Sequence, residues 1–140
     1  MAKPKEAVVK LVERFGEMWA RNDKNIKDVP GSSEGGLGVY ILYDGSTPVY
    51  IGKGRIRSRL RDADGSDRRG NAWDHFSWYV LAEKSLIHDV EVLMIRMLPP
   101  HLRRLTRQTG HFKGVHSTDQ KRANRTAKYI DRVRLMKTGK

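Results

Sequence analysis

The spacing of apolar residues in the first half of the chain predicts one helix, a loop and a hairpin. Residues 5–21 predict an amphipathic helix, with apolar positions three or four residues apart: Val8, Leu11, Val12, Phe15, Met18 and Trp19. Residues 22–36 are polar and rich in glycine, which indicates a loop. Two β-rich runs follow, "LGVYILY" and "VYIG", and the "DGST" between them is typical of a hairpin turn.

The rest of the chain, from Lys53 onward, predicts three more helices and one more strand. "KGRIRSRLRDA", from Lys53 to Ala63, places Ile56, Leu60 and Ala63 on one helical face. Residues 64–71 indicate a loop, and "HFSWYVL" alternates as a third strand. "SLIHDVEVLMIRML" predicts a helix that the following prolines end, with this buried stripe: Leu86, Val90, Leu93, Met94 and Met97. Residues 101–117 resemble a loop, and a basic helix is expected from Asp119, with Ala123, Ala127, Ile130 and Val133 facing inward.

Together these elements predict the α+β class, with a small central three-stranded antiparallel sheet flanked by helices. An amphipathic N-terminal helix and a basic C-terminal helix would be added to it. We expect a helix and linker in residues 1–35, a core in residues 36–112 and a basic helix packing on the core in residues 113–140. At 140 residues the whole chain suits one domain.

Charge narrows the class of partner. The chain has 28 Lys and Arg residues against 16 Asp and Glu residues, a formal net charge of +12. Such a surface attracts polyanions, with nucleic acid the first candidate and an anionic membrane surface the second. The absence of cysteine excludes disulfides, thiolate zinc sites and cysteine nucleophiles, and it is compatible with the reducing cytoplasm that we expect. No segment approaches the roughly 20 apolar residues of a membrane-spanning helix.

Two tyrosine triplets carry the most specific signal. "GVY" ends at Tyr40 and "YIG" begins at Tyr50, each within a strand of the predicted hairpin. An arginine on a helix follows, Arg59, then an aromatic strand, then Glu91 on a helix, and last the segment "LPPHLRRLTRQTGHF". This order over about residues 36–112 resembles the GIY-YIG nucleases. The resemblance implies a small antiparallel sheet flanked by helices, and hydrolysis of DNA phosphodiesters with one divalent metal ion.

The resemblance also implies roles for individual residues. Tyr40 and Tyr50 would orient or deprotonate the attacking water or bind phosphate, with either order open. A free phenol ionises near pH 10, so neighbouring cations, a metal ion or residues such as Lys53 and Arg59, would favour the phenolate. Glu91 offers a hard oxygen ligand to Mg²⁺ or Mn²⁺, although pairing with Arg96 or His88 is an alternative.

The remaining residues of the expected site would bind substrate. Arg59 would contact the scissile phosphate. Arg55 and Arg57 are alternatives to it, because the spacing from the YIG glycine to the arginine is one residue shorter than usual in the family. Gly38 and Gly52 would leave room for a substrate backbone, and Lys53 would bind substrate beside them. A basic rim is expected to contact phosphates, formed by Arg55, Arg57, Arg61, Arg68, Arg69, Arg103, Arg104 and Arg107, with the basic tail as an extension.

Three functions remain open at this stage. The first is a magnesium- or manganese-dependent endonuclease acting on double-stranded or branched DNA. The second is a nucleic-acid-binding module that keeps the nuclease fold without turnover. Thr106 supports the second, because the family often has an asparagine there, and a hydroxyl has fewer donors and a shorter reach. The third is an RNA-directed protein, which the charge allows. A monomer of this size has little room for base readout, which a dimer would add.

Overall fold

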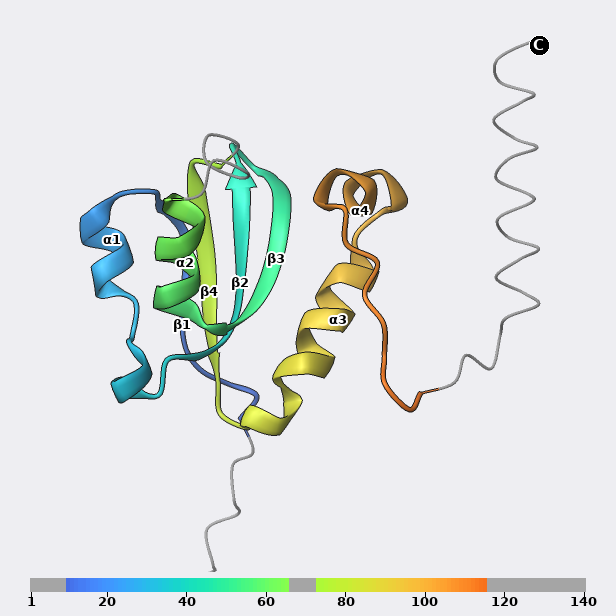
Figure 1. Cartoon of the computed structure of the whole chain (residues 1–140), viewed down its shortest axis with the longest axis horizontal. Helices are drawn as coiled ribbons and strands as arrows, with labels where there is room; N and C mark the ends of the chain where they lie inside the picture. The colour runs from blue at the N-terminus through green and yellow to red at the C-terminus, as the bar shows by residue number, and fades with distance from the viewer. Residues whose placement is uncertain (1–9, 66–72, 116–140) are drawn as a thin grey trace, which may run out of the picture.

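The computed structural model describes residues 10–65 and 73–115 of the chain (Figure 1). Within these ranges the fold is α+β, with a four-stranded antiparallel sheet in the order β1-β4-β2-β3. The elements are β1 (Val12–Ala20), α1 (Asp23–Asp28), η1 (Ser32–Glu34), β2 (Leu37–Asp44), β3 (Thr47–Arg55), α2 (Ile56–Asp64), β4 (His75–Leu81), η2 (Lys84–Leu86), α3 (Ile87–Met97) and α4 (Pro100–Thr106). The predicted class is correct, but the sheet has one strand more than the three expected. No helix in the described ranges is both long and apolar enough to cross a bilayer.

The extra strand is β1, in a segment for which the sequence predicted a helix. Residues 5–9 of that predicted helix lie outside the described ranges, but Val12–Ala20 pairs with β4 along one edge of the sheet. Two register shifts interrupt the pairing, one between Val12 and Arg14 and one between Gly16 and Trp19. Each shift interrupts the alternation of apolar and polar residues that is typical of a strand. The apolar residues of β1 are therefore spaced three or four positions apart, as in a helix. The segment before residue 36 therefore contributes a strand to the sheet.

The predicted hairpin is present and forms the other half of the sheet. β2 and β3 pair from Leu37 with Arg55 to Asp44 with Thr47, joined by a tight turn at Gly45 and Ser46. Gly45 has a φ of 61°, a left-handed conformation that glycine adopts without steric cost. β4 then pairs with the inner side of β2 and leaves β3 as an edge strand. The two tyrosine-bearing strands are thus neighbours, and one of them borders the sheet.

Helices cover both faces of the sheet, with α1 and α2 on one side and α3 and α4 on the other (Figure 1). α2 begins at Ile56 rather than Lys53, because β3 continues to Arg55. Its predicted apolar face is correct, since Ile56, Leu60 and Ala63 are all buried. They pack in the main core with residues of α1, β2 and β4: Ile26, Val29, Tyr40, Leu42, Phe76, Trp78 and Val80.

Three further segments differ from the sequence predictions: the helix α3, the segment after it, and the segment before β2. In α3 the buried apolar residues are Val92 and Ile95, whereas much of the predicted stripe is exposed: Leu86, Leu93 and Met97. Pro100–Thr106, expected as loop, forms α4. Residues 22–36 contain α1, which begins where the side chain of Asn22 accepts a hydrogen bond from the backbone of Asn25. The predicted C-terminal helix lies outside the described ranges, as do Arg68 and Arg69.

Candidate functional site

Tyr40 and Tyr50 lie next to each other on one face of the hairpin. The strand register places Tyr50 opposite Leu42 and Tyr40 opposite Gly52, so the tyrosines are diagonal neighbours. Their ring centroids are 6.2 Å apart, with the ring planes tilted by 42°. Tyr40 exposes only 2% of its surface, whereas Tyr50 is half-buried at the border of the core. Tyr50 is therefore the phenol that is more accessible from solvent.

The two motif glycines make room for the protein itself. A Cβ atom at Gly52 would lie 2.2 Å from Cζ of Tyr40 and 2.3 Å from its hydroxyl oxygen. A Cβ atom at Gly38 would lie 1.9 Å from the backbone carbonyl oxygen of Tyr79 on β4. The expected room for a substrate backbone is thus filled by a tyrosine ring at Gly52 and by a neighbouring strand at Gly38. The spacing between "GVY" and "YIG" has a structural reason, because it places Gly52 opposite Tyr40, and the tyrosine ring occupies the space that a side chain at position 52 would need.

The three arginines considered for phosphate binding have different surroundings. Arg59 is exposed on α2, and its Nε atom lies 3.4 Å from the position that a Cβ at Gly54 would take. Arg55 is exposed at the beginning of α2. Arg57, by contrast, donates from Nε to the carbonyl of Val29 at 2.7 Å and from Nη2 to the carbonyl of Lys27 at 2.9 Å. Of the three, Arg59 lies beside the Gly52–Gly54 segment, and Arg57 instead ties α2 to the end of α1.

Arg57→Gln is expected to lower the free energy of unfolding by about 2 kcal/mol, because two hydrogen bonds from a charged donor are lost. Arg55→Gln, the control, should change stability by less than about 0.5 kcal/mol. Urea unfolding followed by tryptophan fluorescence measures both. An Arg57→Gln variant with unchanged stability and weakened DNA binding would restore Arg57 to the substrate-binding residues.

Glu91 faces the sheet from α3 and pairs with Lys53 of β3. The Nζ atom of Lys53 lies 3.6 Å from Oε1 of Glu91, and the Glu91 side chain is 15% exposed. The same Nζ lies 2.5 Å from Nδ1 of His88, one turn earlier on α3. The Nε2 atom of His88 is buried without a hydrogen-bond partner in the described structure. Glu91 therefore pairs with Lys53 and not with Arg96 or His88, the two alternatives from the sequence, and His88 contacts the same lysine.

The candidate residues form two groups that meet at β3. Successive side chains of a strand point to opposite faces, so Lys53 points away from the face that carries Tyr50 and Gly52. The tyrosine pair lies on the α2 side, whereas Lys53, His88 and Glu91 lie on the α3 side. The structure therefore does not gather all candidates into one pocket. The tyrosine pair contacts Gly52 on one face of the edge strand, and Glu91 and His88 contact the next residue, Lys53, on the other face.

A divalent cation at this site would have a single protein carboxylate, that of Glu91, as its ligand. Glu91 supplies a partly exposed carboxylate oxygen, the ligand type that Mg²⁺ and Mn²⁺ prefer. In residues 10–65 and 73–115 no three acidic or histidine side chains form a cluster that would hold a metal ion. Water and phosphate oxygens would complete the coordination, as is usual for Mg²⁺ bound at phosphates. The ammonium group of Lys53 would have to move aside or share the carboxylate.

No family model, curated protein or solved structure matches this chain. The resemblance to the GIY-YIG nucleases therefore stays a prediction from the motif order.

One residue near the site was missed by sequence reasoning. The side-chain amide of Gln108 accepts a hydrogen bond from the backbone N–H of Ile51 at 2.9 Å and donates one to its carbonyl. It pairs with the edge of β3 as a neighbouring strand would. Thr106 is buried, and its hydroxyl donates to the carbonyl of Arg103 at 2.9 Å, within α4. Both residues belong to the "LTRQTGHF" segment, the only signal that could have directed attention to Gln108.

Proposed function

We propose that the protein is a divalent-metal-dependent endonuclease that hydrolyses DNA phosphodiester bonds. The observation that supports the proposal is that the tyrosine pair and the Lys53–Glu91 pair contact consecutive residues of the edge strand, Gly52 and Lys53. Tyr40 lies against Gly52, and Lys53, the next residue, pairs with Glu91. Because the tyrosine pair and the Lys53–Glu91 pair lie on opposite faces of the sheet, a substrate strand would have to pass round the edge of β3 beside Gly52 and Lys53 to contact both. The high positive charge of the chain provides the long-range attraction for DNA.

Each side chain has a role in the proposed reaction, on one or the other face of the edge strand. Tyr50, the more accessible phenol, orients the attacking water, and the buried Tyr40 holds the ring of Tyr50 in place. Lys53 is 38% exposed and neutralises charge on the phosphate. Arg59, beside Gly54, donates hydrogen bonds to a phosphate oxygen. A cation on Glu91 would supply Lewis-acid stabilisation of the developing negative charge.

A cleavage assay tests the proposal directly. Supercoiled plasmid and a branched oligonucleotide are incubated with the full chain and Mg²⁺ or Mn²⁺, with EDTA as the control. Nicked or linear product that requires the metal ion supports the endonuclease. DNA binding without any product under all these conditions would contradict it.

Tyr50→Phe is expected to reduce the cleavage rate about 100-fold, since general acid–base groups commonly contribute that much or more. The aromatic ring stays, so the fold and DNA affinity should be unchanged. The matched control is Tyr43→Phe, a tyrosine further along β2 that pairs with Pro48 and His75. Single-turnover rates and Kd values for the two variants separate chemistry from binding. Equal rates for both would remove the Tyr50 hydroxyl from the mechanism.

A second candidate function is a DNA-binding module without turnover. Two observations favour it: Glu91 already pairs with Lys53, and the Thr106 hydroxyl is satisfied inside α4. Under this alternative the Lys53–Glu91 pair joins β3 to α3 as a structural contact. The plasmid assay above decides between the two candidates.

A further inference from the structure

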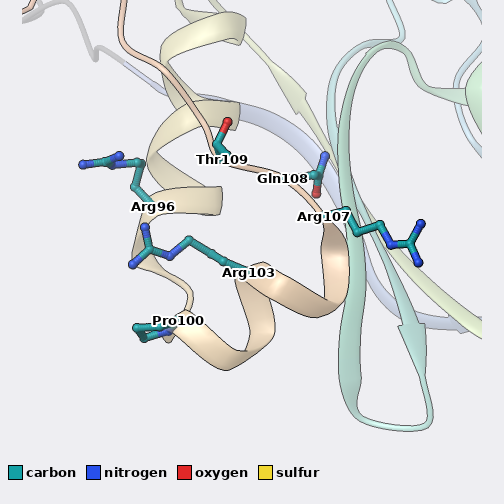
Figure 2. Close-up of a pocket in the computed structure, with 6 residues that line it drawn as sticks. All are labelled: Arg96, Pro100, Arg103, Arg107, Gln108 and Thr109. Atoms are coloured by element: carbon teal, nitrogen blue, oxygen red, sulfur yellow. The ribbon is translucent and has the colours of Figure 1, made fainter. Parts of the chain in front are cut away.

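A hollow of about 600 Å³ lies at the corner between α3 and α4, outside the groups described above. Arg96 of α3 lines it together with Pro100, Arg103, Arg107, Gln108 and Thr109 (Figure 2). In Figure 2 Arg96 and Arg103 extend to the same side, while Arg107 points the opposite way. We call this hollow the Arg96–Arg103 pocket. Its volume falls in the range of ligand sites, about 300–1,000 Å³.

The chemistry of the lining points to an anion. Three of the lining residues are arginines, and none is acidic. The Nε atom of Arg103 is buried and has no hydrogen-bond partner in the described structure. A buried donor that stays unsatisfied costs free energy, and a charged donor costs more. An oxyanion in the pocket would accept hydrogen bonds from the guanidinium groups of Arg96 and Arg103, the fork geometry by which arginine binds phosphate.

The pocket adjoins the edge strand of the candidate site. Gln108 lines the pocket and also pairs with Ile51, two residues before Lys53. Arg96 lies five positions after Glu91 on α3, about 7.5 Å further along the helix axis and about 140° round it. Glu91 faces β3, and Arg96 faces the hollow. The pocket is therefore connected to the edge strand through Gln108 and is separate from the carboxylate of Glu91.

We infer that the Arg96–Arg103 pocket binds a phosphate group of the nucleic-acid strand other than the phosphate that is cleaved. The proposed function supplies the identity of the strand, whereas the anion site follows from the pocket itself. The phosphate is either a backbone diester or a terminal monoester, which share the oxyanion that the two guanidinium groups recognise. Arg96 and Arg103 are substrate-positioning residues in this assignment.

Binding of fluorescent duplex DNA is measured over a series of salt concentrations for wild type, Arg103→Gln and Arg96→Gln. Loss of a phosphate contact should weaken binding about tenfold for Arg103 and about threefold for the more exposed Arg96. It should also reduce the slope of log Kd against log salt by about one. The control is Arg14→Gln, which removes the same charge from an exposed position on β1, at the far edge of the sheet. It should weaken binding by less than about twofold.

Because Arg103→Gln can disturb α4, a second readout uses the intact protein. The Nε–Hε resonance of Arg103, assigned by its absence from the Arg103→Gln spectrum, should shift when DNA is added. Duplexes with and without a 5′-phosphate distinguish a terminal monoester from the backbone, and inorganic phosphate tests whether the free ion suffices. An unmoved Arg103 resonance, with Arg96→Gln binding as Arg14→Gln does, would overturn the assignment.

The outcomes for the pocket and for the proposed function are separable. Wild-type protein that never cuts DNA, but whose affinity falls in the two pocket variants, keeps the phosphate site and removes the endonuclease. Metal-dependent cutting that persists with unchanged affinity in both variants keeps the endonuclease and removes the phosphate site.

Discussion

Glu91→Gln is expected to reduce metal-dependent DNA cleavage by about 10³-fold, because metal-ion stabilisation of a phosphoryl transition state is worth several kcal/mol. Glutamine keeps the length and shape of the side chain, so packing against the sheet is preserved. The variant loses one negative charge 3.6 Å from Lys53, which frees the ammonium group for phosphate. DNA affinity should therefore stay the same or rise slightly while the cleavage rate falls by that factor.

Asp89→Asn is the matched control for this prediction. It makes the same change of charge two residues earlier on α3, at an exposed position. Its cleavage rate should stay within about twofold of wild type. The rates are compared in Mg²⁺ and in Mn²⁺ at saturating DNA, and circular dichroism verifies the fold. If Glu91→Gln cut DNA as fast as Asp89→Asn, Glu91 would not be the metal ligand and the endonuclease proposal would lose its central residue.

The hairpin and α2 could be predicted from the sequence because each carries a local signal. The "DGST" turn and the flanking β-rich runs indicate the hairpin within a few residues. Ile56, Leu60 and Ala63 repeat at the helical period, and all three are buried as expected. Such elements depend mainly on contacts and backbone preferences close in the sequence.

β1 could not be predicted because its conformation depends on a distant strand. Val12–Ala20 pairs with residues about 60 positions later, and its two register shifts remove the alternation by which a strand is recognised. Gly16, which is unfavourable inside a helix, was the available warning. A Cβ there would lie 2.4 Å from the indole nitrogen of Trp78, so this glycine marks a close approach in the sheet.

α3 shows a different limit. Val90, Leu93, Met94 and Met97 form one apolar face of this helix, yet the structure exposes Leu93 and Met97, so the hydrophobic pattern alone does not identify the buried face. The structure turns Val92 and Ile95 inward, and the same rotation brings His88 and Glu91 toward β3. Glu91 could be singled out because a carboxylate among apolar residues is unusual. Its partnership with Lys53, and the division of the site by β3, depend on the three-dimensional packing of the helix on the sheet.

Gly52→Ala is expected to lower the free energy of unfolding by about 3 kcal/mol, the upper part of the range for overpacked cores. The new methyl group would lie 2.2 Å from Cζ of Tyr40, whose ring is enclosed by the core. Backbone strain does not contribute, because the φ angle of Gly52 lies outside the left-handed region. Gly65→Ala is the control: its φ is −88° and the nearest atom to the added Cβ is 3.6 Å away. It should change stability by less than about 0.5 kcal/mol. Urea unfolding measures both variants.

A double-mutant cycle identifies the cause of that loss. Tyr40→Leu removes the atoms that the new methyl group would meet, so adding Gly52→Ala in that background should cost less than about 1 kcal/mol. An equal cost in both backgrounds would show that Gly52 is needed for a reason other than the phenol of Tyr40. If the cycle gives the expected coupling, the second glycine of the paired triplets is explained by packing alone. Gly52 would then have a structural role, and the proposed reaction would depend on the Tyr50 hydroxyl, Lys53 and Glu91.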